Sequence, residues 1–157
     1  MSNEKALISD IMKFTHDPLG FVMYAFPWGV AGGPLEKYPG PDTWQVEILH
    51  DLGEKLLKNK MTVQDVLRYA VGSGNGSGKS TLAAWLILWA MATFEDTRGV
   101  VTENTENQLR TKTWAELAKW ALARPVKRSI ARTAMAAMIT RCPGPTKGAG
   151  AVRAMAR

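Results

Sequence analysis

One glycine-rich run carries the residue types that could bind a phosphate group. It reads Val71-Gly72-Ser73-Gly74-Asn75-Gly76-Ser77-Gly78-Lys79-Ser80-Thr81, and it lies between an apolar segment at 66–71 and a longer one at 82–94. Glycines allow the backbone to curl so that successive N–H groups point at an anion, and a following helix adds its own unpaired N–H groups. The order of strand, loop and helix is that of a P-loop.

The spacing assigns a role to each part of this loop. Lys79 would reach the β- and γ-phosphates of a nucleotide as the catalytic cation, and the Ser80 hydroxyl would contact Mg²⁺. We therefore expect ATP and Mg²⁺ as cofactors. The strict pattern has glycine where this chain has Ser73, which a serine tolerates if its φ angle stays negative. The alternative is a flexible glycine linker that carries a lysine by chance. The expected phosphate contacts are Ser73, Gly74, Asn75, Gly76, Ser77, Gly78, Lys79, Ser80 and Thr81.

Charge and cysteine content limit the class of protein. The net charge is +6, but residues 1–120 hold 12 Lys and Arg against 14 Asp and Glu, whereas residues 121–157 hold eight Lys and Arg and no acid. The single cysteine, Cys142, excludes an internal disulfide and is typical of a reducing cytosol. We see no secretion signal, and the apolar run at 82–94 is too short to span a bilayer. We expect a cytoplasmic protein that is not secreted.

Periodicity and caps predict the elements that position the loop. Apolar spacing predicts a helix at 3–15, a second helix that begins after Asp42, and a buried helix at about 80–94. The segment at 99–102 reads as a second strand, and Thr105 with Gln108 resembles a capping box that opens another helix. This order favours an α/β fold, a partial P-loop NTPase with a parallel sheet and flanking helices. The fold is incomplete, because two strands cannot cover both helices.

The composition changes after residue 120. Residues 1–120 contain all 13 aromatic residues, and residues 121–157 are rich in Ala, Arg, Pro and Gly. Such a segment cannot bury enough apolar surface to fold, so we expect a disordered basic tail. The expected organisation is an N-terminal helical segment at 1–61, a P-loop core fragment at 62–120 and the tail at 121–157.

With these residues in view, the chain resembles the front of the ATPase domain of a bacteriophage terminase large subunit, the ATP-driven motor that packages viral DNA. The resemblance covers about residues 5–120. Four stretches carry it, in the order expected for the family: 17–29, with Asp-Pro-Leu-Gly-Phe-Val and Ala-Phe-Pro-Trp-Gly; Trp44-Gln45; 73–80 followed by 83–90; and 102–114.

The resemblance implies further roles. Gln45 stands where terminases carry a glutamine that reads adenine, although it could equally be an ordinary solvent-facing helix residue. Arg110 and Lys112 could face DNA or a partner subunit, or be solvated helix charges. The implied partners are double-stranded phage DNA, the terminase small subunit and the portal of the prohead, in the cytoplasm of a bacterial host.

Two elements of a complete motor are missing from the 157 residues. No apolar run ends in Asp-Glu, the second metal-binding element of such ATPases, and no acid follows Glu116 to build the nuclease. Glu103 and Glu106 follow the second strand but lack the preceding apolar run. We therefore expect a truncated or frameshifted terminase, with a genuine nucleic-acid-binding tail as the rival. The alternative functions are a non-catalytic nucleotide-binding fragment, or another P-loop NTPase such as a helicase loader or small-molecule kinase.

Overall fold

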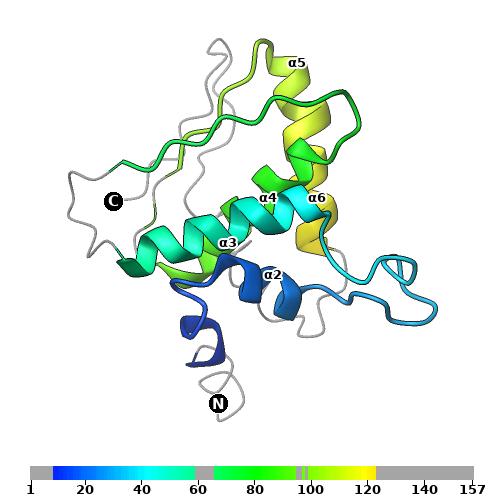
Figure 1. Ribbon diagram of the computed structural model, residues 1–157. Helices are drawn as coiled ribbons and strands as arrows, with labels where there is room; N and C mark the ends of the chain where they lie inside the picture. The colour runs from blue at the N-terminus through cyan, green and yellow to red at the C-terminus, as the bar shows by residue number, and fades with distance from the viewer. Residues whose placement is uncertain (1–8, 59–65, 95–96, 98, 123–157) are drawn as a thin grey trace.

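The computed structural model describes residues 9–58, 66–94, 97 and 99–122, and the folded elements are helices (Figure 1). Residues 9–12 form a short helical turn. The longer elements are α2 (Pro18–Ala25), α3 (Thr43–Lys58), α4 (Lys79–Thr93), α5 (Glu106–Gln108), the π-helical segment η1 (Leu109–Thr113) and α6 (Trp114–Leu122).

Local sequence explains where these helices begin. The Asp17 carboxylate accepts a hydrogen bond from the Gly20 N–H at 2.8 Å, and Pro18 occupies the first turn of α2, where a missing N–H costs nothing. The Thr105 hydroxyl accepts from the Gln108 N–H at 3.2 Å, as the expected capping box requires. Because Asp17 and Pro18 start the helix, residues 21–25 continue it to the end of α2, and the non-helical residues 26–29 follow.

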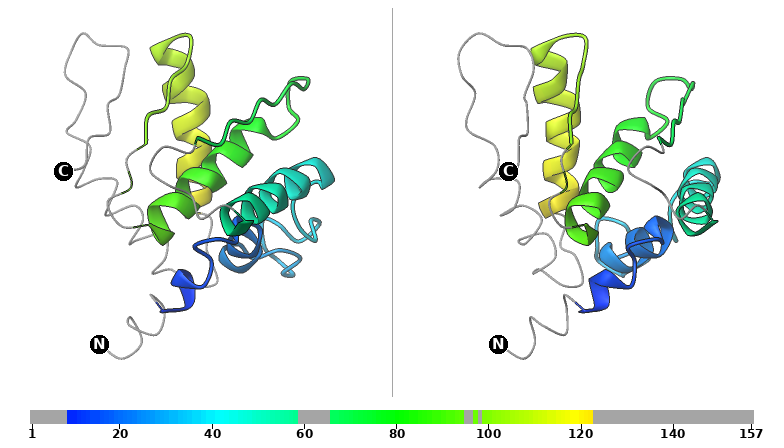
Figure 2. Two further views of the ribbon diagram at one scale, coloured as in Figure 1. Left: turned by 60° about the vertical axis from the view of Figure 1, so that its left-hand side comes forward. Right: turned by 90° about the vertical axis from the view of Figure 1, so that its left-hand side faces the viewer.

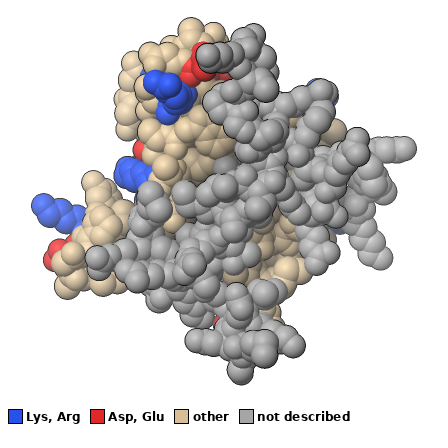
Figure 3. Space-filling model, turned by 180° about the vertical axis from the view of Figure 1, so that it is seen from behind, with Lys and Arg blue, Asp and Glu red and all other residues tan. Residues whose placement is uncertain are grey.

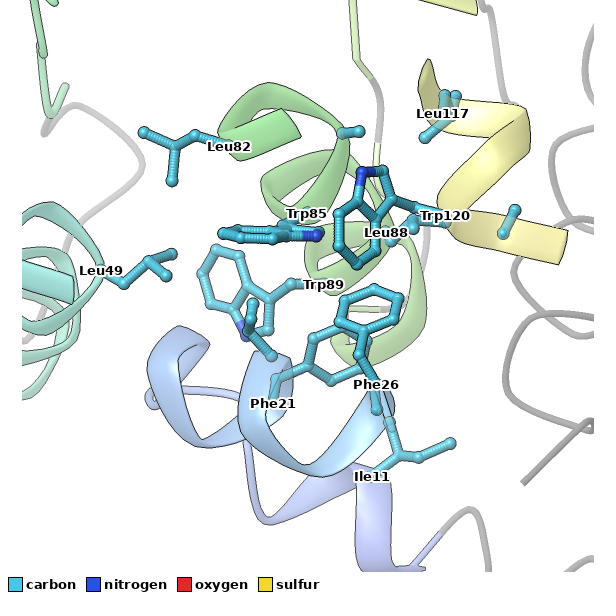
Figure 4. Packing of buried hydrophobic residues seen from close by; sticks show 14 residues of the cluster. Ile11, Phe21, Phe26, Leu49, Leu82, Trp85, Leu88, Trp89, Leu117 and Trp120 are labelled. Carbon is cyan, nitrogen blue, oxygen red and sulfur yellow. The ribbon is translucent and has the colours of Figure 1, made fainter. Parts of the chain in front are cut away.

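Helix α4 packs against α6 and against α2, and α2 packs in turn against α3. Two further views show α4 between α6 on one side and the pair α2 and α3 on the other (Figure 2). The buried side chains of all four helices point into the space between them (Figure 4). The core therefore draws on both the 1–61 and the 62–120 segments of the expected organisation.

Four aromatic rings form the centre of this core: Phe26, Trp28, Trp85 and Trp120. Every pair among them is in contact, with ring centroids between 4.8 and 6.3 Å apart. Four of these six contacts are edge-to-face, the arrangement that suits the ring quadrupoles. The cluster joins the end of α2 to α4 and to α6, so it fixes the helix that follows the glycine-rich loop.

The expected α/β fold with a parallel sheet is wrong for the part of the chain that the structure describes. The segments at 66–74 and 99–103 contain no strand there, only an isolated bridge residue at Val100. Among the described residues, no backbone hydrogen bond joins 66–72 to 99–102. The two segments run apart from each other, one leading to α4 and the other to α5 (Figure 2).

The physical reason for this correction is the way the apolar surface is buried. Parallel strands are stable when helices cover both faces of the sheet. Here α4 buries its apolar side chains against other helices instead, and the two candidate strands stay at the surface. Val66 is 70% exposed and Val100 is 69% exposed. An apolar run beside a glycine-rich loop therefore does not by itself make a strand.

The helical predictions fare better. The helix expected at about 80–94 is α4, and the helix expected after Asp42 is α3, whose residues Trp44, Ile48, Leu49, Leu52 and Leu56 all pack on the core. The tail expected to be disordered lies outside the described residues, except that α6 continues to Leu122.

Candidate phosphate-binding loop

The glycine-rich run forms a turn that leads directly into α4 (Figure 1). Gly76 and Gly78 have φ angles of +79° and +85°, in the left-handed region that favours glycine. Gly78 is the N-cap of α4, and Lys79 is its first residue. Two of the loop glycines are thus required by the backbone path, and the loop-to-helix half of the expected motif is present without the preceding strand.

Lys79 folds back over the loop that precedes it. Its Nζ donates to the carbonyl oxygens of Ser73 at 2.8 Å and Gly74 at 2.6 Å. The hydroxyl oxygens of Ser73 and Ser77 lie 3.1 and 3.3 Å from the same nitrogen. Because an ammonium has three N–H bonds, these four oxygens share them. The loop therefore curls around the charged group that would neutralise a phosphate.

The two loop serines brace each other. Their hydroxyl oxygens are 2.5 Å apart, and the Ser77 hydroxyl also donates to the Gly74 carbonyl at 3.0 Å. Ser73 is the departure from the strict glycine pattern. Its hydroxyl oxygen accepts a hydrogen bond from Lys79, and its hydroxyl is also hydrogen-bonded to that of Ser77, across the turn.

The first turn of α4 carries two hydroxyls with different surroundings. Ser80, the expected Mg²⁺ ligand, is exposed. Thr81 is partly buried, and its hydroxyl donates to Glu116 Oε1 on α6 at 2.7 Å. Gly78 supplies no side-chain cap, so the first N–H groups of α4 are not satisfied by a cap hydrogen bond.

Gln45 reaches the same turn from α3. It is 3% exposed, its Oε1 accepts from the Asp42 N–H at 3.0 Å, and its Nε2 donates to the Gly78 carbonyl at 3.1 Å. It is not the solvent-facing residue that we allowed as an alternative. The structure thus brings the expected residues Gln45, Gly78 and Lys79 together.

Glu116 is the residue beside this loop to which we gave no role. Its Oε1 accepts from Thr81, from Trp120 Nε1 at 2.8 Å and from Lys119 Nζ at 3.1 Å. Burial raises the pKa of the Glu116 carboxyl, but these three hydrogen bonds outweigh burial and hold the pKa below its usual value of 4.5. In the sequence, the spacing of three and four residues to Lys119 and Trp120 indicates that Glu116 can contact these two side chains on one helix. It does not predict the contact with Thr81, which lies 35 residues away.

A polar cluster on α3 anchors the chain that leads to the loop. The Tyr69 hydroxyl donates to Asp51 Oδ2 at 2.6 Å, and Lys55 Nζ lies 2.6 Å from the same oxygen and 4.9 Å from the Tyr69 ring centroid. Hydrogen bonds from Lys55 and then Tyr69 lower the pKa of Asp51. Helix α3 therefore contacts both the start of this segment, through Asp51, and its end, through Gln45.

The remaining acidic candidates, Glu103 and Glu106, do not form part of a metal-binding cluster in the described residues. Within the described ranges, no three His, Cys, Asp or Glu side chains gather in a group that could hold a metal ion. Glu103 accepts from the Thr113 hydroxyl at 3.0 Å, and Glu106 is an exposed residue in the first turn of α5. The exposed hydroxyl of Ser80, in the first turn of α4, is the protein oxygen beside the loop that a Mg²⁺ ion would use.

The charges of the described surface are mixed in sign. Arg110 and Lys112 are both exposed on η1. In the view from behind, the blue and red side chains lie beside one another near the edge of the molecule (Figure 3). On the described part of this face, no large patch of a single sign is visible.

Comparison of the chain with protein-family models, with curated proteins and with solved structures yields no match. Among the helices in the described residues, none has both the length and the apolar character needed to cross a membrane.

Proposed function

We propose that the loop at 73–81 binds the phosphates of ATP together with Mg²⁺. The observation that carries the proposal is the position of Lys79. Its ammonium lies within 3.3 Å of four loop oxygens, directly at the start of a 15-residue helix. A phosphate at this place would meet a lysine, glycine-rich backbone and the positive end of the α4 dipole.

Binding would require Lys79 to change partners. The ammonium would exchange the carbonyl oxygens of Ser73 and Gly74 for phosphate oxygens, which bear more negative charge and form stronger hydrogen bonds. Ser80, exposed in the first turn of α4, would contribute its hydroxyl to Mg²⁺. The cation, when bound, neutralises part of the phosphate charge.

The order of the four sequence stretches supports a place for this chain in the ATP-binding part of a phage terminase large subunit. Under that proposal the activity of the whole motor is DNA packaging in the bacterial cytoplasm, with double-stranded DNA, the small subunit and the portal as partners. The proposal rests on the loop and on these stretches.

A second candidate is a fragment that binds nucleotide without hydrolysing it. The observation that favours it is the state of Glu116, the carboxylate that approaches the first turn of α4. Three donors already occupy it, and its pKa is lowered, so it is a poor proton acceptor.

Titration calorimetry with ATP, with and without Mg²⁺, tests the binding site. We expect Lys79→Ala to weaken ATP binding by about 1.5–3 kcal/mol, roughly a ten- to 150-fold rise in Kd, because a charge-assisted contact is lost. Lys37→Ala is the matched control, because Lys37 is an exposed residue of the loop between α2 and α3. Equal ATP affinity in the wild type and Lys79→Ala would contradict the proposed site.

A further inference from the structure

Gln45 is buried in a way that is unusual for glutamine. The side chain sits in the first turn of α3 with 3% of its surface exposed. Burying an amide costs free energy unless its polar atoms are paired. Here the oxygen accepts from the Asp42 N–H, and the nitrogen donates to the Gly78 carbonyl, 33 residues further along the chain. The side chain therefore connects the start of one helix to the start of another.

The Gly78 carbonyl is the junction between the loop and α4. It accepts from Gln45 Nε2 at 3.1 Å and from the Leu82 N–H at 3.0 Å, which is the first helical hydrogen bond of α4. The peptide that joins Gly78 to Lys79 is planar and trans, so its C=O and N–H point in opposite directions. Whatever holds the Gly78 carbonyl toward α3 therefore directs the Lys79 N–H away from α3.

The contact depends on glycine at position 78. A Cβ placed on Gly78 would lie 2.8 Å from Gln45 Nε2, closer than real Cβ contacts come. The φ angle of +85° also disfavours any other residue. The absence of a side chain at Gly78 thus leaves room for the Gln45 amide. Both hydrogen bonds of Gln45 are made to the backbone of the chain itself, without a nucleobase.

We propose that Gln45 is a positioning residue for phosphate binding, which fixes the Gly78–Lys79 peptide so that the first N–H groups of α4 face a triphosphate whatever base it carries. This inference rests on the proposed function of the loop. Gln45 has one N–H and one lone pair left over, but the side chain is buried, and reading adenine with them would help ATP alone. The two roles therefore predict different results for ligands that lack adenine.

The test compares three probes on the full chain: Mg²⁺ with ATP, with GTP and with inorganic tripolyphosphate. Gln45→Glu keeps the size and the oxygen that accepts from Asp42, but it replaces the donor to Gly78 with an acceptor. Gln45→Met removes both hydrogen bonds. Gln108→Glu on α5 is the matched control. We expect both Gln45 variants to weaken all three probes by the same factor, about tenfold for a lost hydrogen bond to a buried group.

A loss confined to ATP would overturn the proposal in favour of base reading, and unchanged affinities would overturn it outright. If the wild type binds none of the probes, the proposed function fails, and amide exchange of the free chain still decides the positioning role. We expect the Leu82 amide, which donates to the Gly78 carbonyl, to exchange at least tenfold faster in Gln45→Glu, with α6 unchanged. Exchange equal to the wild type would contradict the role, as would loss of helical circular dichroism in both variants.

Discussion

The Thr81 hydroxyl donates a 2.7 Å hydrogen bond to Glu116 Oε1, which joins the first turn of α4 to α6 across 35 residues of sequence. Glu116 also accepts from Lys119 and from Trp120, a member of the four-ring cluster. One carboxylate thus connects the residue after the candidate Mg²⁺ ligand to the aromatic core. Disturbing it is expected to affect both stability and the geometry of the loop.

The pH dependence of stability should reveal this carboxylate. Because the folded pKa of Glu116 lies below 4.5, its ionised form stabilises the fold above that pH, and the contribution is lost as the pH falls through the folded pKa. We expect Glu116→Gln to be less stable than the wild type at about pH 7, with the difference shrinking below about pH 4.5. Urea melts across this range measure it, with the exposed Glu47→Gln as control. A difference that stayed constant with pH would contradict the assignment.

Substitution of the loop glycines should separate a constrained position from a tolerant one. Gly78→Ala must adopt a φ angle of +85° and approach Gln45, so we expect it to lower the free energy of unfolding by about 1–3 kcal/mol. Gly74 has a negative or extended φ, and a Cβ placed on it would meet no atom within 4 Å, so Gly74→Ala should change stability by less than about 0.5 kcal/mol. Thermal melts of both variants decide it, and equal effects would argue against the loop geometry.

Two tryptophans of the four-ring cluster should respond differently to the same change. Trp120 Nε1 donates to Glu116, whereas Trp85 Nε1 is buried without a hydrogen-bond partner among the described residues. Both indoles contact the other three rings of the cluster. We therefore expect Trp120→Phe to cost about 1.5–3 kcal/mol more than Trp85→Phe, the contribution of a hydrogen bond to a charged group. Denaturant unfolding measures the difference, and a larger loss in Trp85→Phe would refute it.

Hydrolysis is expected to be absent even where ATP binds. Turnover needs a group that orients the attacking water and carboxylates that hold the metal. Glu116 is occupied by three donors, and Glu103 accepts from Thr113. A phosphate-release assay on the purified chain should give the same background rate for the wild type and Lys79→Ala. Steady Mg²⁺-dependent release that disappears in Lys79→Ala would show that the chain supplies its own catalytic carboxylate.

Local patterns in the sequence located several elements correctly. The glycine spacing placed a loop before Lys79, the apolar stretch predicted α4, and Thr105 with Gln108 predicted the start of α5. Each of these depends on residues within a few positions of one another. Caps and helix propensity are interactions over three or four residues, so they can be recognised without knowing the rest of the fold.

The sheet was predicted by the same kind of reasoning and is wrong in the described residues, because a strand exists only where another strand pairs with it. The apolar run at 66–71 is compatible with a strand, but its neighbours decide whether it forms one. The Tyr69 hydroxyl donates a hydrogen bond to Asp51 on α3, and the Val66 side chain remains exposed. No pattern within the run distinguishes these outcomes.

The sequence by itself therefore determined the glycine-rich loop, its lysine and the helix that follows. Only the tertiary structure decided that Gln45 holds Gly78, that Glu116 meets Thr81, and that Phe26, Trp28, Trp85 and Trp120 form one cluster. The first two of these contacts span 33 and 35 residues of sequence. They form because burial of apolar helix faces brings distant segments together, and that burial depends on all the helices at once.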